Sequence, residues 1–160
     1  MTAAPVLRAG RDSDGPGFIA LLTECWLEYP GCVVEIDGEV PELHALASYF
    51  ANDSGALWVC DIAGQIVGMI GTRPLGGAEW ELCKLYAYAG HRGSGLAHAL
   101  YETMLAHILA AGGRSVRLWT DTRFERAHRF YEKLGFVRQP DIRELHDLSN
   151  SFEYEYLKQV

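Results

Sequence analysis

A strand that passes through a glycine-rich loop into an amphipathic helix is the feature that most restricts how this chain can fold. Residues 86–100 read YAYAGHRGSGLAHAL. Beyond the glycines, apolar side chains recur four residues apart at Leu96, Leu100, Met104 and Ile108. This spacing places them on one face of a helix. A strand that feeds a core-facing helix predicts an α/β architecture.

The remaining pattern supplies the other elements of such a sheet. Strands are expected at 6–9, 56–62, 65–71, 80–88 and 115–120, from Phe136, and at 152–157, where an alternating strand closes the sheet. Helices are expected from Asp12 or Ser13 to about Tyr29, from Pro41 to Phe50, and over 123–134. Three consecutive strands followed by alternating strands and helices predict a mixed sheet with antiparallel N-terminal strands and a parallel centre, flanked by helices. A length of 160 residues fits a single domain spanning residues 1–160.

Composition excludes several classes of protein. The net charge of −7 argues against a nucleic-acid partner. No apolar stretch approaches the roughly 18 residues of a membrane span, so no membrane partner is expected. Residues 1–5 show neither the basic nor the apolar region of a signal peptide, which predicts a cytoplasmic protein. The six histidines and four cysteines lack metal-ligand spacing, so we expect no metal and reduced, buried thiols.

The charges are distributed unevenly along the chain. Between Arg11 and Arg73 there is no Lys or Arg, whereas that stretch contains ten acidic residues. One interpretation is a solvated acidic face. The other is an electrostatic field that attracts a cationic ligand.

The glycine-rich loop is the strongest chemical signal. Backbone N–H groups at a helix N-terminus bind anions, and glycines allow phosphate to approach the backbone. A P-loop requires Lys and Ser or Thr after its last glycine, but Leu96 and Ala97 follow Gly95. A dinucleotide fingerprint that starts at Gly93 requires Gly or Ala where His98 stands. Taken alone, the loop could equally be a simple turn.

Three segments together resemble the GNAT superfamily of N-acyltransferases. Residues 92–97, RGSGLA, match its R/Q-x-x-G-x-G/A pattern, and residues 130–136, FYEKLGF, match the segment that ends its last helix. Ahead of both, residues 80–87, WELCKLYA, are similar to the family's E-L-K-R-L-Y-V strand. The resemblance covers residues 78–138 most firmly. It implies a GNAT-like sheet and an enzyme that uses acetyl-CoA as cosubstrate.

The resemblance also implies which residues hold acetyl-CoA. The pyrophosphate would be bound by main-chain N–H groups of Arg92, Gly93, Ser94, Gly95, Leu96 and Ala97. The strand at Leu85, Tyr86 and Ala87 would splay from its neighbour, bind the pantetheine arm and polarise the thioester carbonyl. One departure is Phe124, which stands where the family often has an asparagine that contacts the cofactor.

Three residues are candidates for proton transfer, two of them for the base and one for the acid. The nucleophilic amine needs a base, which would be Glu81 or a water chain, with Glu79 as an alternative. The competing interpretation of Glu81 is a strand glutamate that faces solvent or bonds a neighbour. Tyr131 stands at the family's position for the general acid that protonates the leaving thiolate. It could also be a core aromatic, and the two roles are compatible.

The acceptor site is less defined. The resemblance implies an acceptor pocket at about residues 26–42, beside Thr120 and Asp121, and at the 139–150 loop, and within it Trp26, Glu28 and Tyr29 could form an aromatic and acidic wall that suits a cationic amine. The expected partner is therefore a small-molecule amine or amino acid, and the sequence does not name it. Two alternatives stay open, an acyl-CoA sensor with little turnover and an acetyltransferase of protein N-termini or lysines. Homodimers are common in the family, but nothing in the sequence fixes an interface.

Overall fold

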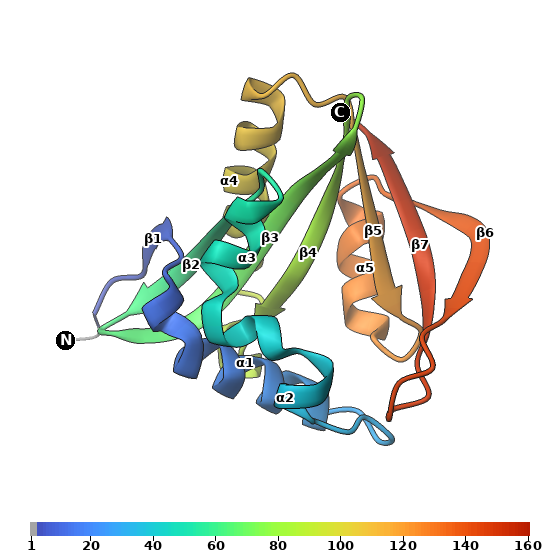
Figure 1. Ribbon diagram of the computed structural model, residues 1–160. Coiled ribbons are helices and arrows are strands. Elements are labelled where there is room, and N and C mark those ends of the chain that lie inside the picture. The colour runs from blue at the N-terminus through green and yellow to red at the C-terminus, as the bar shows by residue number, and fades with distance from the viewer. Residues whose placement is uncertain (1–2) are drawn as a thin grey trace.

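Seven strands form one sheet in the computed structural model, which describes residues 3–160 (Figure 1). The strand order is β1-β2-β3-β4-β5-β7-β6. In chain order the elements are β1 (Val6–Ala9), α1 (Gly15–Leu27), α2 (Ile36–Glu39), α3 (Leu46–Asn52), β2 (Ala56–Ile62), β3 (Gln65–Gly76), β4 (Glu79–Ala87), α4 (Leu96–Ala110), β5 (Ser115–Asp121), α5 (Glu125–Lys133), β6 (Val137–Glu144) and β7 (Phe152–Gln159).

The pairing confirms the predicted mixed sheet. Strands β1 to β4 pair antiparallel in sequence order, and β5, β7 and β6 also pair antiparallel. The single parallel pair among the described residues is β4 with β5, in the middle of the sheet. None of the helices in residues 3–160 has the length and apolar character needed to cross a membrane.

The parallel pair opens into a fork. Residues 79–81 of β4 pair with 115–117 of β5, and the pairing stops there. Figure 1 shows the two strands diverging toward the C-terminal end of β4. The splaying expected at residues 85–87 is therefore present, and it leaves the end of β4 without a partner on its β5 side.

A β-bulge in β4 lies where the fork opens. Met69 pairs with Tyr86 and Gly71 pairs with Cys83, so two residues of β4 oppose one residue of β3. One of these two is Lys84, whose φ of +54° is unusual for a residue other than glycine. Bulges bend a strand and redirect its side chains. The ion pair between Lys84 and Glu42, at 2.9 Å, fixes the bulged side chain.

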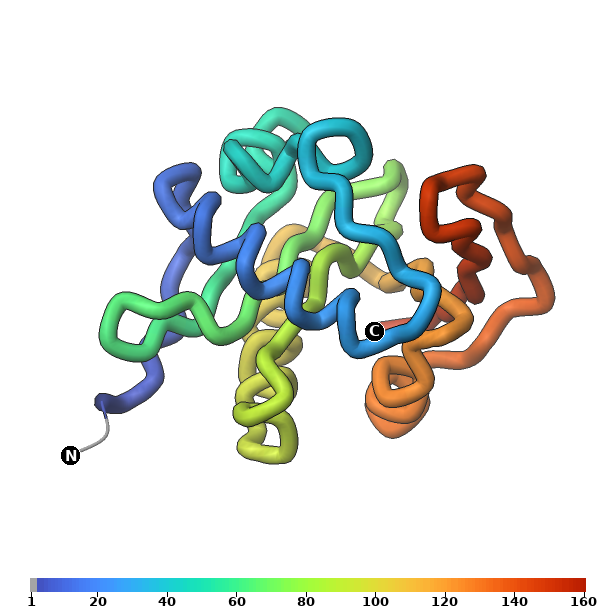
Figure 2. Tube along the Cα trace, turned by 90° about the horizontal axis from the view of Figure 1, so that it is seen from below, coloured from blue at the N-terminus to red at the C-terminus, as the bar shows by residue number. Residues whose placement is uncertain are grey.

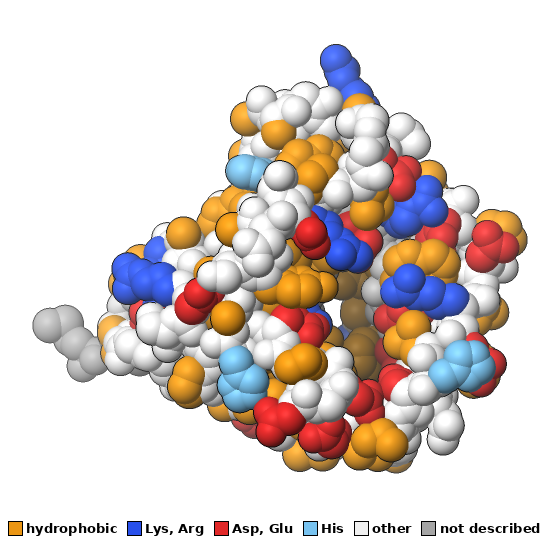
Figure 3. Space-filling model, in the orientation of Figure 1, with side chains coloured by type: hydrophobic (Ala, Val, Ile, Leu, Met, Phe, Trp, Pro, Cys, Tyr) orange, Lys and Arg blue, Asp and Glu red, His pale blue; other side chains and the backbone are white. Residues whose placement is uncertain are grey.

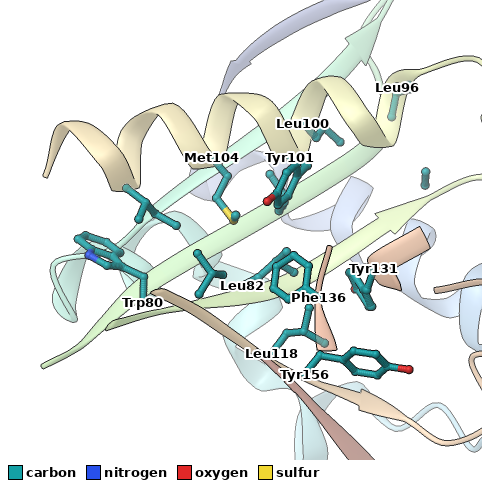
Figure 4. Close-up of a cluster of buried hydrophobic side chains, with 14 of the residues drawn as sticks. Trp80, Leu82, Leu96, Leu100, Tyr101, Met104, Leu118, Tyr131, Phe136 and Tyr156 are labelled. Atoms are coloured by element: carbon teal, nitrogen blue, oxygen red, sulfur yellow. The ribbon is translucent and has the colours of Figure 1, made fainter. Parts of the chain in front are cut away.

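Two hydrophobic cores lie on opposite faces of the sheet. Adjacent β3 residues alternate between them, because Ile66 and Met69 pack with α1 and α3, while Val67 and Ile70 pack with α4. Figure 2 shows α4 and α5 on one side of the strands and α2 and α3 on the other. In Figure 4, Leu100, Tyr101 and Met104 point from α4 toward the sheet. Each fully buried apolar side chain of this size stabilises the fold by about 1.5–3 kcal/mol.

Several element boundaries differ from the predictions. The first helix begins at Gly15 after a short 3-10 turn, and the second starts as a 3-10 turn that becomes α-helical at Leu46. The short helix α2 was not predicted, and β3 continues beyond residue 71 to Gly76. The short helix α2 and the end of β3 carry no apolar periodicity of their own, so their conformation depends on tertiary contacts.

The C-terminal strands also correct an expectation. The predicted short strand at Phe136 is β6, an eight-residue strand at the edge of the sheet. Strand β7 does not close the sheet, because it lies between β5 and β6. Almost all of β6 is exposed, so neither of its faces carries the alternation that marks a half-buried strand. All four cysteines are free thiols, but Cys32 and Cys83 are only partly buried.

Candidate active site

Two cavities meet at the fork between β4 and β5. The first has a volume of about 420 Å³ and lies between the end of β4, the start of α4 and α5. The second has about 570 Å³ and extends over β4, β5 and the segment before β7. Figure 3 shows the hollow on this face, with acidic and basic side chains around it. The residues that line both cavities are Leu85, Tyr86, Phe124, Ala127 and Tyr131.

The glycine-rich loop forms one wall of the first cavity. Gly93 and Gly95 have φ values of +78° and +87°, which side-chain-bearing residues rarely adopt. No atom lies within 4 Å of where a Cβ would stand at either glycine. Helix α4 starts directly after Gly95, and no side chain caps it. Its first N–H groups therefore have no partner within the helix and are available to an anion.

The other loop residues differ in what they offer. Arg92, Gly93, Gly95 and Ala97 line the first cavity, together with the end of β4 at Leu85–Ala87. The Ser94 hydroxyl donates to the His91 carbonyl, so it stabilises the loop from inside. The Leu96 side chain is buried in the core beside α4. Neither Ser94 nor Leu96 lines the cavity, and only main-chain atoms of these two residues remain for a ligand.

Of the two glutamates considered for the base, Glu81 lines the second cavity and Glu79 does not. Glu79 accepts two hydrogen bonds from Arg117, at 2.9 and 3.1 Å. The Glu81 side chain is 17% exposed. Its Oε1 accepts a hydrogen bond from the Cys83 thiol at 3.2 Å. Burial raises the pKa of Cys83, so the thiol keeps its proton and remains a donor at neutral pH.

Tyr131 lies where the two cavities meet. Its side chain is 6% exposed and packs with Phe136 and Tyr156, as Figure 4 shows. Burial, followed by the nearby Tyr86 and Cys83, raises the pKa of its phenol. The hydroxyl therefore keeps its proton at neutral pH and can donate it. The ring belongs to the core while the residue still lines both cavities, as the sequence allowed.

Comparison with known proteins identifies the family. Residues 18–136 match the model of the acetyltransferase (GNAT) family. The chain belongs to this family. It is 30% identical over 138 residues to the uncharacterized N-acetyltransferase YjgM of Escherichia coli, covering 83% of this chain and 82% of that protein. It also matches N-acetyltransferase 8F1 of the rat, at 28% identity over 71% of this chain, but spans only 51% of the rat protein. As the resemblance implied, the GNAT chain is an acetyltransferase.

Solved GNAT structures confirm the fold. A GNAT acetyltransferase from Staphylococcus aureus Mu50 superimposes with a TM-score of 0.84 at 18% identity, over 98% of this chain and 99% of that one. The acetyltransferase yncA of Salmonella typhimurium, solved with its cofactor acetyl-CoA, has a TM-score of 0.72 at 14% identity and covers 98% of this chain and 94% of its own. At these identities the likeness shows the fold alone.

The expected wall of Trp26, Glu28 and Tyr29 is divided in this GNAT chain. Trp26 lines the second cavity, where its Nε1 donates to the Tyr86 hydroxyl at 3.0 Å. Tyr29 lines the first cavity and packs on Phe124, with ring centroids 4.8 Å apart. Glu28 lines neither cavity, so the structure does not bring the three residues together at one cavity.

The two acids expected at the acceptor site, Glu28 and Asp121, are both paired with arginines. The Glu28 carboxylate accepts from both terminal nitrogens of Arg92, at 2.7 and 2.8 Å, and lines neither cavity. This pair ties the glycine-rich loop to the end of α1. Asp121 lines the second cavity and binds Arg123 at 2.8 and 2.9 Å. Burial opposes its charge, but the Arg123 hydrogen bonds prevail and lower the pKa of Asp121.

The segments expected around the acceptor contain most of the charged residues of the second cavity, but the sequence did not indicate Arg73, Lys84 or Glu153. The acids of this cavity are Glu39, Glu42, Glu81, Asp121, Asp147 and Glu153, and its cations are Arg73, Lys84 and Arg143. They come from distant parts of the chain, so no local motif marks them. Burial raises the pKa of Glu153, although Arg143 opposes the shift. In residues 3–160, no three His, Cys, Asp or Glu side chains are grouped as a metal ion would require.

Proposed function

We propose that this acetyltransferase moves an acetyl group from acetyl-CoA to the primary amine of a small molecule or amino acid. The observation that carries the proposal is the meeting of two cavities at Tyr131, one beside the glycine-rich loop and one beside Glu81. Such an arrangement accommodates two substrates that approach one point from different sides.

The first cavity suits acetyl-CoA. Main-chain N–H groups over residues 92–97 would bind the pyrophosphate, because the helix N-terminus carries partial positive charge and the glycines leave the approach open. Leu85, Tyr86 and Ala87 lie where β4 has lost its β5 partner. Their free backbone groups would bind the pantetheine arm, and one N–H would polarise the thioester carbonyl.

The reaction requires that the amine lose protons and that the thiolate gain one. Glu81, directly or through water, would take a proton from the ammonium form of the acceptor, and the free amine would attack the thioester carbon. The C–N bond forms as the C–S bond breaks, the second proton of the nitrogen passes to solvent, and Glu81 also returns its proton to solvent after the reaction. Tyr131 would protonate the departing thiolate and recover a proton from solvent. Acid–base groups of this kind typically contribute about 10²–10⁴-fold to the rate.

The second cavity suits the amine. Six carboxylates line it against three cationic side chains. The excess of negative charge would attract a protonated amine and raise its local concentration. Its acidic side chains come from the acidic stretch before Arg73, from β4, and from β5, β7 and the segment before β7.

The test is calorimetric titration of the protein with acetyl-CoA and with CoA, followed by a thiol-release screen of amines, amino acids and peptides. We expect acetyl-CoA to bind and thiol release to require a primary amine. Binding without release from any acceptor would favour an acyl-CoA sensor. Release with peptides alone would favour a protein acetyltransferase, and absence of binding would contradict the assignment of the first cavity.

A further inference from the structure

Arg73 stands in the second cavity beside the candidate base. It lies on β3 and pairs in register with Glu81 on β4, so the two side chains project from neighbouring positions of adjacent strands. Both line the cavity. The Arg73 side chain is 34% exposed, which makes it accessible from the cavity while its base is packed.

Two other arginines of the chain show how a guanidinium group is hydrogen-bonded in this protein. Arg117 binds both oxygens of Glu79 through Nε and Nη2, at 2.9 and 3.1 Å. Arg123 binds both oxygens of Asp121 through the same two nitrogens, at 2.9 and 2.8 Å. In each case a carboxylate closes the planar edge formed by Nε and Nη2, which is the geometry that guanidinium and carboxylate groups favour.

The same edge of Arg73 is not closed by a carboxylate, because only Nη2 has a partner, in a long hydrogen bond to Glu81. Its Nη2 lies 3.4 Å from Glu81 Oε2, and its Nη1 lies 3.6 Å from Asp53 Oδ2. Its Nε is buried and has no hydrogen-bond partner within residues 3–160. A buried donor without a partner destabilises the protein unless a ligand satisfies it. Arg73 therefore has the geometry of a carboxylate receptor that internal partners only half occupy.

The other cations of the cavity are not available in this way. Lys84 binds Glu42 at 2.9 Å, and Arg143 binds Glu153 at 2.7 Å. An anionic group that enters the cavity would therefore meet a strong internal competitor at either of these residues. At Arg73 it would meet a guanidinium whose Nε has no partner within the described residues.

We propose that the acceptor is an α-amino acid, whose carboxylate binds the Nε and Nη2 edge of Arg73 while its amine lies at Glu81. The inference rests on the proposed function and narrows its acceptor. In an α-amino acid the amine nitrogen and a carboxylate oxygen are about 3 Å apart, as the bond lengths dictate. This span matches the 3.4 Å between Arg73 Nη2 and Glu81 Oε2. The carboxylate of the acceptor would thus contact Arg73 and its amine would contact Glu81, each at a shorter distance than the 3.4 Å between these two side chains.

Matched acceptor pairs test the proposal. Thiol release is measured for phenylalanine against phenethylamine, tryptophan against tryptamine, and lysine against cadaverine. We expect kcat/KM to favour the amino acid by about 10- to 100-fold in at least one pair, the effect of hydrogen bonds to a charged group. In Arg73→Gln this preference should disappear, so that kcat/KM for the amino acid falls to about that for the amine of the same pair. Arg73→Lys should recover only part of it, because lysine lacks the planar edge.

Arg143→Gln is the matched control, because it removes a positive charge from the same cavity where the guanidinium is already bound to a carboxylate. Its ratio of amino acid to amine should stay near that of the unaltered protein. An equal loss of preference in both variants would overturn the proposal, since the carboxylate would then respond to the net charge of the cavity. Titration of the preferred amino acid into the CoA-saturated protein gives a second readout, and binding that Arg73→Gln leaves unchanged would also overturn it.

The outcomes separate this inference from the proposed function. Thiol release from the amines with no preference for the amino acids would overturn the inference and leave the proposed function intact. Release from no acceptor at all, while acetyl-CoA binds, would overturn both.

Discussion

The two cavities are built from different parts of the polypeptide. The first depends on main-chain groups, with glycines at positive φ and an uncapped helix start in its wall. The second depends on side chains, and most of its charged residues are engaged in ion pairs. A site made of main-chain groups tolerates few substitutions at its glycines but is insensitive to most of the surrounding side chains. A site made of ion pairs can change its specificity one residue at a time.

The largest effect is expected from Gly95→Val, which alters the main-chain wall of the first cavity. A β-branched residue is strained at a φ of +87°, so the entry to α4 must distort. We expect CoA binding to weaken by at least about 100-fold, because the N–H groups no longer converge on one anion. Calorimetric titration with CoA measures it.

Gly64→Val is the control for this strain. Gly64 has the same φ of +87° with open space around it, but it lies in the turn between β2 and β3. It should lower thermal stability comparably and leave CoA affinity unchanged. Similar losses of CoA binding in both variants would attribute the effect to unfolding and not to the loop.

Tyr131→Phe tests the point at which the cavities meet. Removing the hydroxyl should lower kcat by about 10²–10³-fold with little change in CoA affinity, as expected for loss of a general acid. Steady-state kinetics with a substrate from the screen measures it. Tyr101→Phe is the control, because that hydroxyl accepts from Lys158 at 2.9 Å and lines neither cavity. Full activity in Tyr131→Phe would remove its role as acid.

Glu81→Gln tests the side-chain cavity. The amide cannot accept a proton, so kcat should fall by about 10- to 100-fold, a smaller loss if water substitutes in part. The matched control is Glu79→Gln, two residues away on the same strand but bound to Arg117. It should keep near-normal kcat and lose some stability. An equal fall of kcat in both variants would indicate that the substitutions perturb the structure of β4 and not the chemical reaction.

The smallest effect is expected from Glu28→Gln, and its direction decides which cavity this residue serves. The structure ties Glu28 to Arg92 of the glycine-rich loop. A partly exposed ion pair of this kind is worth about 0.2–1 kcal/mol, which corresponds to a change of up to about fivefold in CoA affinity. The acceptor KM should stay constant. A raised acceptor KM with normal CoA affinity would return Glu28 to the amine-binding role that the sequence suggested.

How much the sequence could predict follows the same division. The loop at Gly93 and Gly95 could be located because a backbone site demands small residues in a fixed order. Glu28 could not be placed, since its partner Arg92 is 64 residues away and only the fold joins them. Arg73 was noted only as the end of an acidic stretch, because a guanidinium edge that no carboxylate closes is visible only once its neighbours are in position. Strand β6 was underestimated for a related reason, since an exposed edge such as Val137–Glu144 leaves no hydrophobic pattern.

The fork between β4 and β5 would couple the concentration of acetyl-CoA to the stability of the folded protein. Strand ends without a partner are ordinarily where a sheet recruits other chains and aggregates. Here the unpaired end of β4 faces a cavity instead of a neighbouring strand. A pantetheine arm bound there would act as a temporary extra strand, and at 100 times its dissociation constant a ligand adds about 2.7 kcal/mol of stability. The lifetime of the folded chain in a cell would then rise and fall with the acetyl-CoA pool.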